Sequence, residues 1–310
     1  MSPLIPLIAF ILDLVLKDPH SWPHPVRWIG ALLNRMEAWA RSQTRFTLRQ
    51  AGVISLAGLL VTVWLSTAIL TSIPLFGFLL ALALAYAGLS LGGLMKAARD
   101  VLDAIRANDL ETARGRLSML VSRDTSSMDR NELSRSLAET VSENFNDGLT
   151  APFFFLLLGG PVLLWLYKAV STVDSMWGYQ TPKWSSLGWA GARLDDILAF
   201  VPARLSAGLI ILSGFILSRN WKRAMKQTRK QARLMKSPNA GWPMAAAAWV
   251  LEGTMGGWTV YHGQRTFKPL LGPADMEWTE DRLRDLLKLI NLSGWILVLA
   301  GSMLLLVLSA

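Results

Sequence analysis

Residues 121–158, VSRDTSSMDRNELSRSLAETVSENFNDGLTAPFFFLLL, join a strongly polar run to an apolar one without a spacer. Arginines, carboxylates and amides fill the polar part up to Pro152, and the apolar part begins at Phe153. Charges held this close to a bilayer are costly unless they are paired or solvated. The stretch therefore predicts a helical membrane protein with a polar site at the membrane edge.

The polar run has the pattern of a capped helix. Asp129 can cap it, with Glu132 reaching back to complete a capping box. A helix from there to about Asn144 would place four polar residues on one side: Glu132, Ser136, Glu139 and Glu143. Carboxylates on one face repel each other unless a cation or a proton lies among them. A solvated helix face would explain this pattern, but its position at the membrane edge favours a functional site.

The composition indicates an integral membrane protein. The 310-residue chain is 52% hydrophobic and 17% charged, whereas soluble globular proteins are about one quarter charged. Its 14 tryptophans fit anchoring at the membrane interface. The formal net charge of +9 suits anionic lipid headgroups or phosphorylated ligands. No nucleic-acid-binding motif accompanies the charge, so a nucleic-acid partner is not expected.

Two residue counts restrict the chemistry. Cysteine is absent, which excludes disulfides, thiolate catalysis and a cysteine zinc site. Only three histidines occur, which argues against a multi-histidine metal centre. The glycine-rich segments do not match a P-loop, so no recognised nucleotide motif is present.

Hydropathy predicts an all-α, multi-pass membrane protein with one membrane domain, 1–310, and cytoplasmic helical loops. The predicted spans are 4–17, 51–73, 75–94, 152–170, 197–217 and 290–308. The polar loops expected to carry the chemistry are 18–50, 95–151, 171–196 and 218–289. Within the last of these, Gly256–Gln264 is predicted as a glycine-rich loop and Gly272–Lys288 as a polar linker with a short helix.

Segment 152–170 leaves the topology open because Gly159-Gly160-Pro161 interrupts it. It is either one kinked span or a re-entrant pair of half-helices. Positive charge concentrates in 27–49, 96–135 and 219–236, which the positive-inside rule places in the cytoplasm. Simple alternation would put 171–196 on the other side, whereas a re-entrant segment lets every polar motif meet on the cytoplasmic side. We favour the re-entrant interpretation, with an active site that faces the cytoplasm from the inner membrane.

Five motifs, in this order, carry a resemblance to one family. They are DLVLKDPHSWPHPVRWIG (13–30), SRDTSSMDRNELSRSLAETVSENFNDGLTAPFF (122–154), STVDSMWGY (171–179), GARLDDILAFVPARLSA (191–207) and SPNAGWPMAAAA (237–248). Together they resemble the CobD/CbiB proteins of cobalamin biosynthesis, the adenosylcobinamide-phosphate synthases. The similarity runs roughly from Leu12 to Gly263. Ser171, where the family pattern has asparagine, and Met244, where glutamate is common, depart from it.

The resemblance implies a membrane enzyme of late corrinoid assembly, an ATP-dependent acid–amine ligase. It would join the free propionate carboxylate of adenosylcobyric acid to (R)-1-aminopropan-2-ol or its O-phosphate. The product would be adenosylcobinamide or its phosphate. Mg²⁺ and ATP are the implied cofactor and co-substrate. Membrane lipids, other late cobalamin-assembly enzymes and a second copy of the chain are the further partners to consider.

Placed on this chain, the chemistry suggests roles for individual residues. The candidate catalytic carboxylates are Glu139, Glu143, Asp147 and Asp174, and Glu143 or Glu139 would be the general base. Asp195 and Asp196 are the candidate magnesium ligands, because Mg²⁺ prefers hard oxygen ligands. The candidate substrate- and phosphate-binding residues are His24, Arg27, Arg123, Asp124, Asn144, Arg193, Arg204 and Asn239.

Several alternatives stay open. His24 can bind phosphate or only order its proline-rich loop, and the two adjacent aspartates can be an ordinary acid pair at a helix N-terminus. A transporter would also explain a broken membrane helix, although no repeated halves are visible in the sequence. A non-catalytic membrane sensor related to the family would keep the helices and lose the acidic motifs, which this chain retains.

Overall fold

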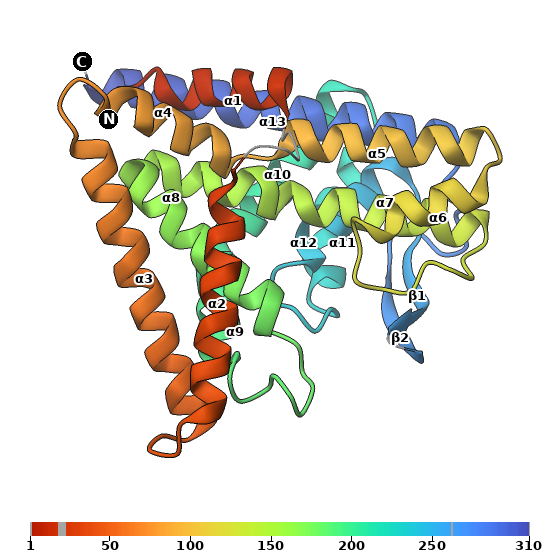
Figure 1. Cartoon of the computed structure of the whole chain (residues 1–310). Helices are drawn as coiled ribbons and strands as arrows, with labels where there is room; N and C mark the ends of the chain where they lie inside the picture. Colours follow the sequence, from red (N-terminus) through yellow and green to blue (C-terminus); the bar gives the residue numbers. More distant parts are fainter. Residues whose placement is uncertain (1, 18–22, 262, 310) are drawn as a thin grey trace. The chain divides into compact units, whose positions relative to one another are not determined.

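The structure, a computed structural model, describes residues 2–17, 23–261 and 263–309. Within them the chain is mostly α-helical (Figure 1). The α-helices are α1 (Ile5–Leu16), α2 (Pro25–Ser42), α3 (Leu48–Ser72), α4 (Gly77–Gly88), α5 (Leu91–Arg106), α6 (Leu110–Ser118), α7 (Arg130–Phe145), α8 (Ala151–Trp177), α9 (Trp189–Leu198), α10 (Phe200–Ile216), α11 (Trp221–Ala232), α12 (Gly241–Leu251) and α13 (Glu280–Ser309). A π-helical turn, η1 (Asn146–Thr150), and two strands, β1 (Met255–Tyr261) and β2 (Gln264–Leu271), complete the described elements. Residues 18–22 of the predicted proline-rich loop lie outside the described residues.

Several helices have the length and composition of membrane spans, which confirms the predicted all-α, multi-pass membrane protein. In the described ranges, four segments qualify: Leu48–Ser72, Gly77–Arg106, Arg130–Trp177 and Glu280–Ser309. The pair α9 and α10, bent by 44°, would be a fifth. On α3, the side chains of Val61, Trp64 and Ile69 are each more than half exposed, as expected for a surface that faces lipid. The predicted run 4–17 corresponds to α1, whose 12 residues are too few to cross a bilayer alone.

Packing divides the chain into two compact units, where the sequence predicts a single membrane domain. The first unit comprises Met1–Ser90, Ala151–Ala199 and Ala300–Ala310, and the second comprises Leu91–Thr150 and Phe200–Leu299. Neither unit is continuous in sequence. Each is therefore completed only when distant parts of the chain come together.

The first unit is held by close helix contacts and a few long-range hydrogen bonds. A Cβ atom at Gly52 of α3 would lie 2.1 Å from the main-chain oxygen of Leu187, so only glycine permits this approach. The Trp165 indole of α8 donates to the Leu84 carbonyl of α4 at 2.9 Å. The Tyr86 hydroxyl donates to the Lys17 carbonyl at 2.6 Å. These two bonds satisfy polar groups across helices, as a membrane interior requires.

Helix α8 is broken at the glycine pair that the sequence singles out. Gly159 and Gly160 both leave the helical region, and Gly160 has φ of 66°, a conformation that favours glycine. Pro161 follows and cannot donate a backbone hydrogen bond to the preceding turn. Figure 1 shows the chain changing direction within α8. The break is confirmed, and re-entry of the segment to the same membrane side stays a prediction.

The second unit is built around α12. Its four consecutive alanines, 245–248, are completely buried, as expected for a helix that is apolar on all sides. It packs against α10 and α11, and the small side chains allow close approach. The Ser213 and Ser293 hydroxyls share a buried hydrogen bond of 2.9 Å between α10 and α13.

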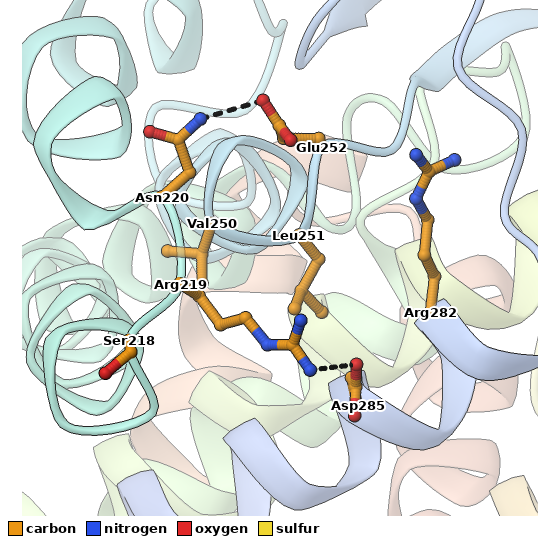
Figure 2. Close-up of a pocket in the computed structure, with 8 residues that line it drawn as sticks. All are labelled: Ser218, Arg219, Asn220, Val250, Leu251, Glu252, Arg282 and Asp285. Atoms are coloured by element: carbon orange, nitrogen blue, oxygen red, sulfur yellow. Dashed lines mark hydrogen bonds and ion pairs between the residues drawn. The ribbon is translucent and has the colours of Figure 1, made fainter.

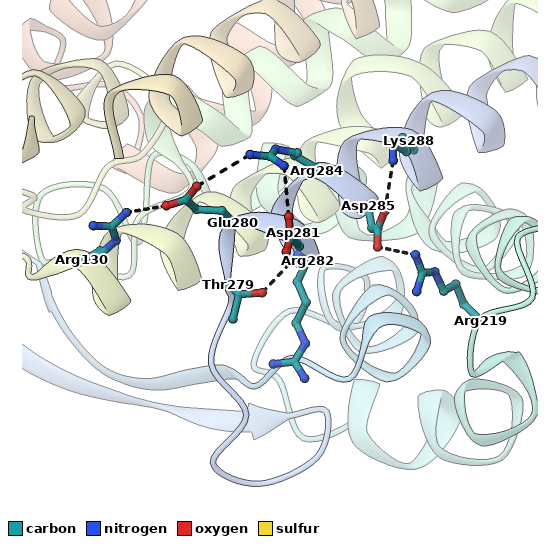
Figure 3. A network of polar contacts seen from close by, with 9 residues as sticks. All are labelled: Arg130, Arg219, Thr279, Glu280, Asp281, Arg282, Arg284, Asp285 and Lys288. Atoms are coloured by element: carbon teal, nitrogen blue, oxygen red, sulfur yellow. Dashed lines mark hydrogen bonds and ion pairs between the residues drawn. The ribbon is translucent and has the colours of Figure 1, made fainter. Parts of the chain in front are cut away.

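Charged pairs fix the first turns of α13 (Figure 3). Glu280 lies 2.6 Å from Arg130 of α7, and Asp285 lies 2.5 Å from Arg219. Arg284 pairs with Asp281 within the helix at 3.1 Å. The segment that carries them is the start of one continuous helix, Glu280–Ser309. The predicted short helix inside a polar linker, separate from the last span, is therefore wrong.

Segment Gly256–Gln264, predicted as a loop, is instead most of a β-hairpin. Strands β1 and β2 pair antiparallel, with Trp258 opposite Phe267 and Tyr261 opposite Gln264. A register irregularity lies between Met255 and Gly257, where Gly256 has φ of 88°. The glycines that suggested a loop provide this bulge, which only glycine adopts easily.

The close approach at Gly52 gives a stability prediction. Gly52→Ala should destabilise the detergent-solubilised protein by about 1–3 kcal/mol, because overpacked side chains force the backbone apart. Gly208→Ala is the matched control, since a Cβ atom there meets no atom within 4 Å. Thermal unfolding followed by circular dichroism measures both. Equal midpoints for Gly52→Ala and wild type would contradict the described packing.

Candidate functional site

Helix α7 carries the acidic row, and its start forms as the sequence predicts. The Asp129 side chain accepts from the Glu132 N–H at 2.8 Å, and the Glu132 carboxylate accepts from the Asp129 N–H at 3.0 Å. This reciprocal capping box fixes where the helix begins. At its other end the helix passes into η1, and π-helical turns of this kind frequently occur at functional sites.

A buried ion pair anchors the middle of α7. Glu139 lies 2.6 Å from Arg123, and the two side chains are 1% and 7% exposed. The second carboxylate oxygen of Glu139 accepts from the Gly256 N–H of β1 at 2.7 Å. Breaking such a pair leaves an uncompensated charge in the interior. The pair therefore ties the segment before α7 and the hairpin to one side chain.

The electrostatic surroundings favour the charged form of Arg123. Burial acts to lower the pKa of its guanidinium, but the Glu139 carboxylate, together with Tyr261 and Glu143, raises the pKa above its ordinary value. Arg123 is thus a permanent cation beside the acidic row. The Arg123 guanidinium is already paired with the Glu139 carboxylate. Arg123 is therefore better suited to hold the acids in position than to bind a phosphate group.

Glu143 is the acid that stands beside this pair. It is partly exposed, and Asp147, Lys268, Arg123 and Glu139 all lie within its electrostatic reach. Asp147 accepts from the Asn146 side chain at 2.7 Å. The sequence predicts Glu143 and Asp147 but not Lys268, Tyr261 or Gly256. No signal could have placed those three, because the hairpin that carries them was not predicted.

Two further predicted residues belong to the same unit near Arg123 and α7. Asp124 is exposed, and its carboxylate accepts from the Ser126 N–H at 2.9 Å and from the Ser126 hydroxyl at 2.7 Å, which lowers its pKa. Asp124 and Arg123 line a cavity of about 50 Å³ with Trp258 of β1. Asn144 donates to Thr140 within α7 at 2.9 Å. This cavity is too small for a corrinoid and lies beneath the hairpin.

Arg204 and Asn239, both predicted as ligand-binding residues, bind each other. The guanidinium donates to the Asn239 side chain at 2.9 Å and to the Phe200 carbonyl at 2.7 Å. It also lies over the rings of Phe200 and Trp242, with centroid distances of 3.4 and 4.6 Å. Stacking of this kind positions a guanidinium and leaves its remaining donors for a ligand.

The other predicted residues lie in the first unit. His24 Nδ1 accepts from the Val26 N–H at 3.2 Å and caps α2, which favours the loop-ordering interpretation of this histidine. Arg27 lies exposed on α2 one turn later. Asp174 of α8 and Asp196 of α9 are within electrostatic reach of each other, and Arg193 is within reach of Asp196. Asp195 is partly buried on α9.

Besides the Arg204–Asn239 contact, the structure brings predicted residues together in two groups. Arg123, Glu139, Glu143 and Asp147 form one group in the second unit, and Asp174, Asp196 and Arg193 form the other in the first unit. Their meeting in one pocket stays a prediction from the sequence. Among the described residues, no three His, Cys, Asp or Glu side chains gather as a ready metal site.

The ion pair can be tested by a double-mutant comparison. Glu139→Gln should destabilise the protein by about 3–5 kcal/mol, since it leaves Arg123 buried without its partner. Adding Arg123→Met should recover much of the loss, because the glutamine oxygen still accepts from the Gly256 N–H and no buried charge remains. Thermal unfolding of the two single variants and of the double variant measures this. A double variant as unstable as the sum of the two single variants would contradict the buried pair.

Matches to known proteins extend over nearly the whole chain. The sequence profile described as "CobD/Cbib protein" matches residues 6–290. Cobalamin biosynthesis protein CobD of Clostridium perfringens (strain 13 / Type A) is 35% identical over 295 residues, 94% of this chain and 93% of that protein. CobD of Citrobacter koseri is 37% identical over 289 residues, and Cobalamin biosynthesis protein CbiB of Salmonella choleraesuis is 37% identical over 290 residues; each match covers 91% of both chains. A search of solved structures gave no match.

The profile match includes both groups of polar residues described above. Because it extends over far more than half of the chain, and relatives above 30% identity are matched along almost their full length, one conclusion follows. This protein belongs to the CobD/CbiB family.

Proposed function

We propose that this protein acts in cobalamin biosynthesis as an amide synthase of the inner membrane, with its active site facing the cytoplasm. It would join the free propionate carboxylate of adenosylcobyric acid to (R)-1-aminopropan-2-ol or its O-phosphate. Family membership and the names of the relatives support the pathway. The observation that supports the chemistry most directly is the row of acids on α7, held in place by the buried Arg123–Glu139 pair.

The reaction requires two kinds of help from the protein. A carboxylate does not react with an amine at neutral pH, and ATP would supply the activating phosphoryl group. The amine arrives as an ammonium ion and must lose a proton before it can attack. Residues that accept a proton and residues that bind phosphate oxygens are therefore both needed.

Glu143 is the carboxylate best suited to take the ammonium proton. Glu139 already accepts from Gly256 and pairs with Arg123, so both of its oxygens are occupied. Glu143 is partly exposed and lies among Asp147 and Lys268. Neighbouring charges of both signs tune the proton affinity of a carboxyl group. Of the two bases that the sequence leaves open, we propose Glu143 as the base and Glu139 as a positioning residue.

The carboxylates fit a magnesium ion that is bound together with substrate phosphates. Mg²⁺ usually takes one or two protein carboxylates and completes its shell with water and phosphate oxygens. Asp196 and Asp174 would hold the ion, since their carboxylates lie within mutual electrostatic reach. Asp195, the third candidate, would contribute from the same helix.

The remaining assignments concern substrates. Arg193 and Arg204 would bind phosphate oxygens through forked hydrogen bonds, and Asn144 and Asn239 would bind corrin side-chain amides. Arg27 and Asp124 lie on exposed surface where an arriving substrate can contact them. Other late cobalamin-assembly enzymes and a second copy of this chain are the proposed protein partners.

One reaction mixture tests the proposal. Purified protein in a neutral detergent is incubated with adenosylcobyric acid, aminopropanol phosphate, ATP and Mg²⁺, and mass spectrometry follows formation of the amide. A parallel reaction contains unphosphorylated aminopropanol. Product that depends on ATP supports the proposal. No product with either amine would reject it in favour of a transporter or a sensor.

Glu143→Gln should lower the turnover number by about 10²–10⁴-fold, the usual contribution of a general base. Expression and thermal stability should remain close to wild type, because the substitution keeps size and polarity. Glu111→Gln, at an exposed position of α6, is the matched control. Near-normal turnover in Glu143→Gln would remove this residue from the mechanism.

Asp196→Asn and Asp174→Asn should each weaken binding of Mn²⁺, used in place of Mg²⁺, by about tenfold or more, since each removes one charged oxygen ligand. Electron paramagnetic resonance of free Mn²⁺ in the presence of ATP measures this. Asp103→Asn, an exposed position on α5, is the control. Asp195→Asn distinguishes the adjacent pair suggested by sequence from the Asp174–Asp196 pair. Unchanged Mn²⁺ affinity in all three variants would reject a metal site here.

A further inference from the structure

A polar cleft in the second unit contains none of the residues assigned above. It has a volume of about 500 Å³. Its walls come from the α10–α11 connection, the C-terminal end of α12 and the first turns of α13 (Figure 2). All of these segments belong to one compact unit. The cleft is therefore a feature of that unit alone.

Two guanidinium groups line the cleft from different elements. Arg219, in the α10–α11 connection, donates to Asp285 at 2.5 Å, and Arg282, on α13, donates to the Glu277 carbonyl at 2.5 Å. In Figure 2 the Leu251 side chain lies between the two arginines. A guanidinium carries five N–H donors, so each arginine retains donors for a ligand. Arginine forks of this kind match phosphate and carboxylate oxygens.

The two carboxylates of the lining are already paired. Glu252 accepts from the Asn220 side chain at 2.8 Å and from Arg223 at 3.3 Å. Asp285 accepts from Arg219 and from Lys288, the latter at 3.4 Å. The cleft and its direct ion-pair partners thus contain four cations, Arg219, Arg223, Arg282 and Lys288, and two carboxylates. The excess positive charge attracts an anion.

The backbone around the cleft adds to this potential. Asn220 precedes the first residue of α11, and its side chain binds Glu252 and does not cap the helix. Asn220 lines the cleft, so the N-terminal end of α11, which carries partial positive charge, begins next to a lining residue. Val250 and Leu251 supply an apolar wall. The lining thus suits a ligand that combines an anionic group with an organic part.

The cleft and the acidic row are linked by a short stretch of the chain. Glu252 lines the cleft, and Gly256, four residues later, binds Glu139. Four residues span at most about 14 Å even when fully extended. The cleft therefore lies within about 14 Å, along the chain, of the backbone group that binds Glu139.

We propose that this cleft binds the phosphate group of a small organic ester, from either a soluble compound or a lipid headgroup. The arginine pair supplies the anion site and the apolar wall receives the attached group. This proposal does not depend on amide synthesis, because binding is measured without turnover. A negative result for phosphate binding therefore does not reject amide synthesis, and a negative result for amide synthesis does not reject phosphate binding.

The test uses the full chain in a neutral detergent. Inorganic phosphate, pyrophosphate and glycerol 3-phosphate are titrated at constant ionic strength, and thermal unfolding and calorimetry report binding. The variant Arg282→Gln should bind these probes about tenfold or more weakly, because one charged hydrogen-bond partner is lost. Arg284→Gln, two residues away and outside the cleft, is the matched control.

Experiments with lipid distinguish a lipid headgroup from a soluble ester as the source of the phosphate group. The protein is placed in nanodiscs of neutral lipid alone or with phosphatidylglycerol. Stabilisation by phosphatidylglycerol that is lost in Arg282→Gln assigns a headgroup, and stabilisation by soluble probes that is lost in the same variant assigns a soluble ester. Equal affinity in wild type and Arg282→Gln, or no stabilisation by any probe, would overturn the proposal.

Discussion

The structure of the second unit depends on one buried pair of opposite charges. Arg123 and Glu139 contact each other at 2.6 Å almost without solvent, and the same carboxylate binds the backbone of β1. Neither charge could stay in this interior alone, because an isolated buried ion is strongly unfavourable. The pair therefore makes the acidic helix, the segment before it and the hairpin interdependent. A unit organised in this way can hold further carboxylates such as Glu143 in fixed positions beside an apolar membrane segment.

The partners that a polar side chain already has distinguish residues that position other groups from residues that can contact a substrate. Glu139 and Arg123 are mutually satisfied, whereas Glu143 and Asp196 remain partly exposed. In the first unit His24 caps α2 and so has a structural task. A polar residue in a family motif is thus not by itself a catalytic residue. Its existing partners indicate how much of its bonding capacity is left for a substrate.

Local signals in the sequence predicted local structure well. The Asp129–Glu132 capping box and the break at Gly159-Gly160 both follow from neighbours within a few residues, and both form as expected. The hairpin was missed because its glycines indicate either a loop or a bulge, and only pairing with β2 distinguishes them. The partners Lys268 and Tyr261 were missed for the same reason. The proximity of Asp174 to Asp196 depends on packing of α8 against α9, which spacing alone does not specify.

The interrupted helix α8 has a consequence for how the protein fits its bilayer. The part after the break, Pro161–Trp177, has a length of about 26 Å at 1.5 Å per residue, shorter than a hydrocarbon core of about 30 Å. Backbone groups at the break also lack helical partners and attract water or polar contacts. The lipid around this segment is therefore expected to be thinned or hydrated. Membrane thickness thus becomes a variable to which the conformation of α8 responds.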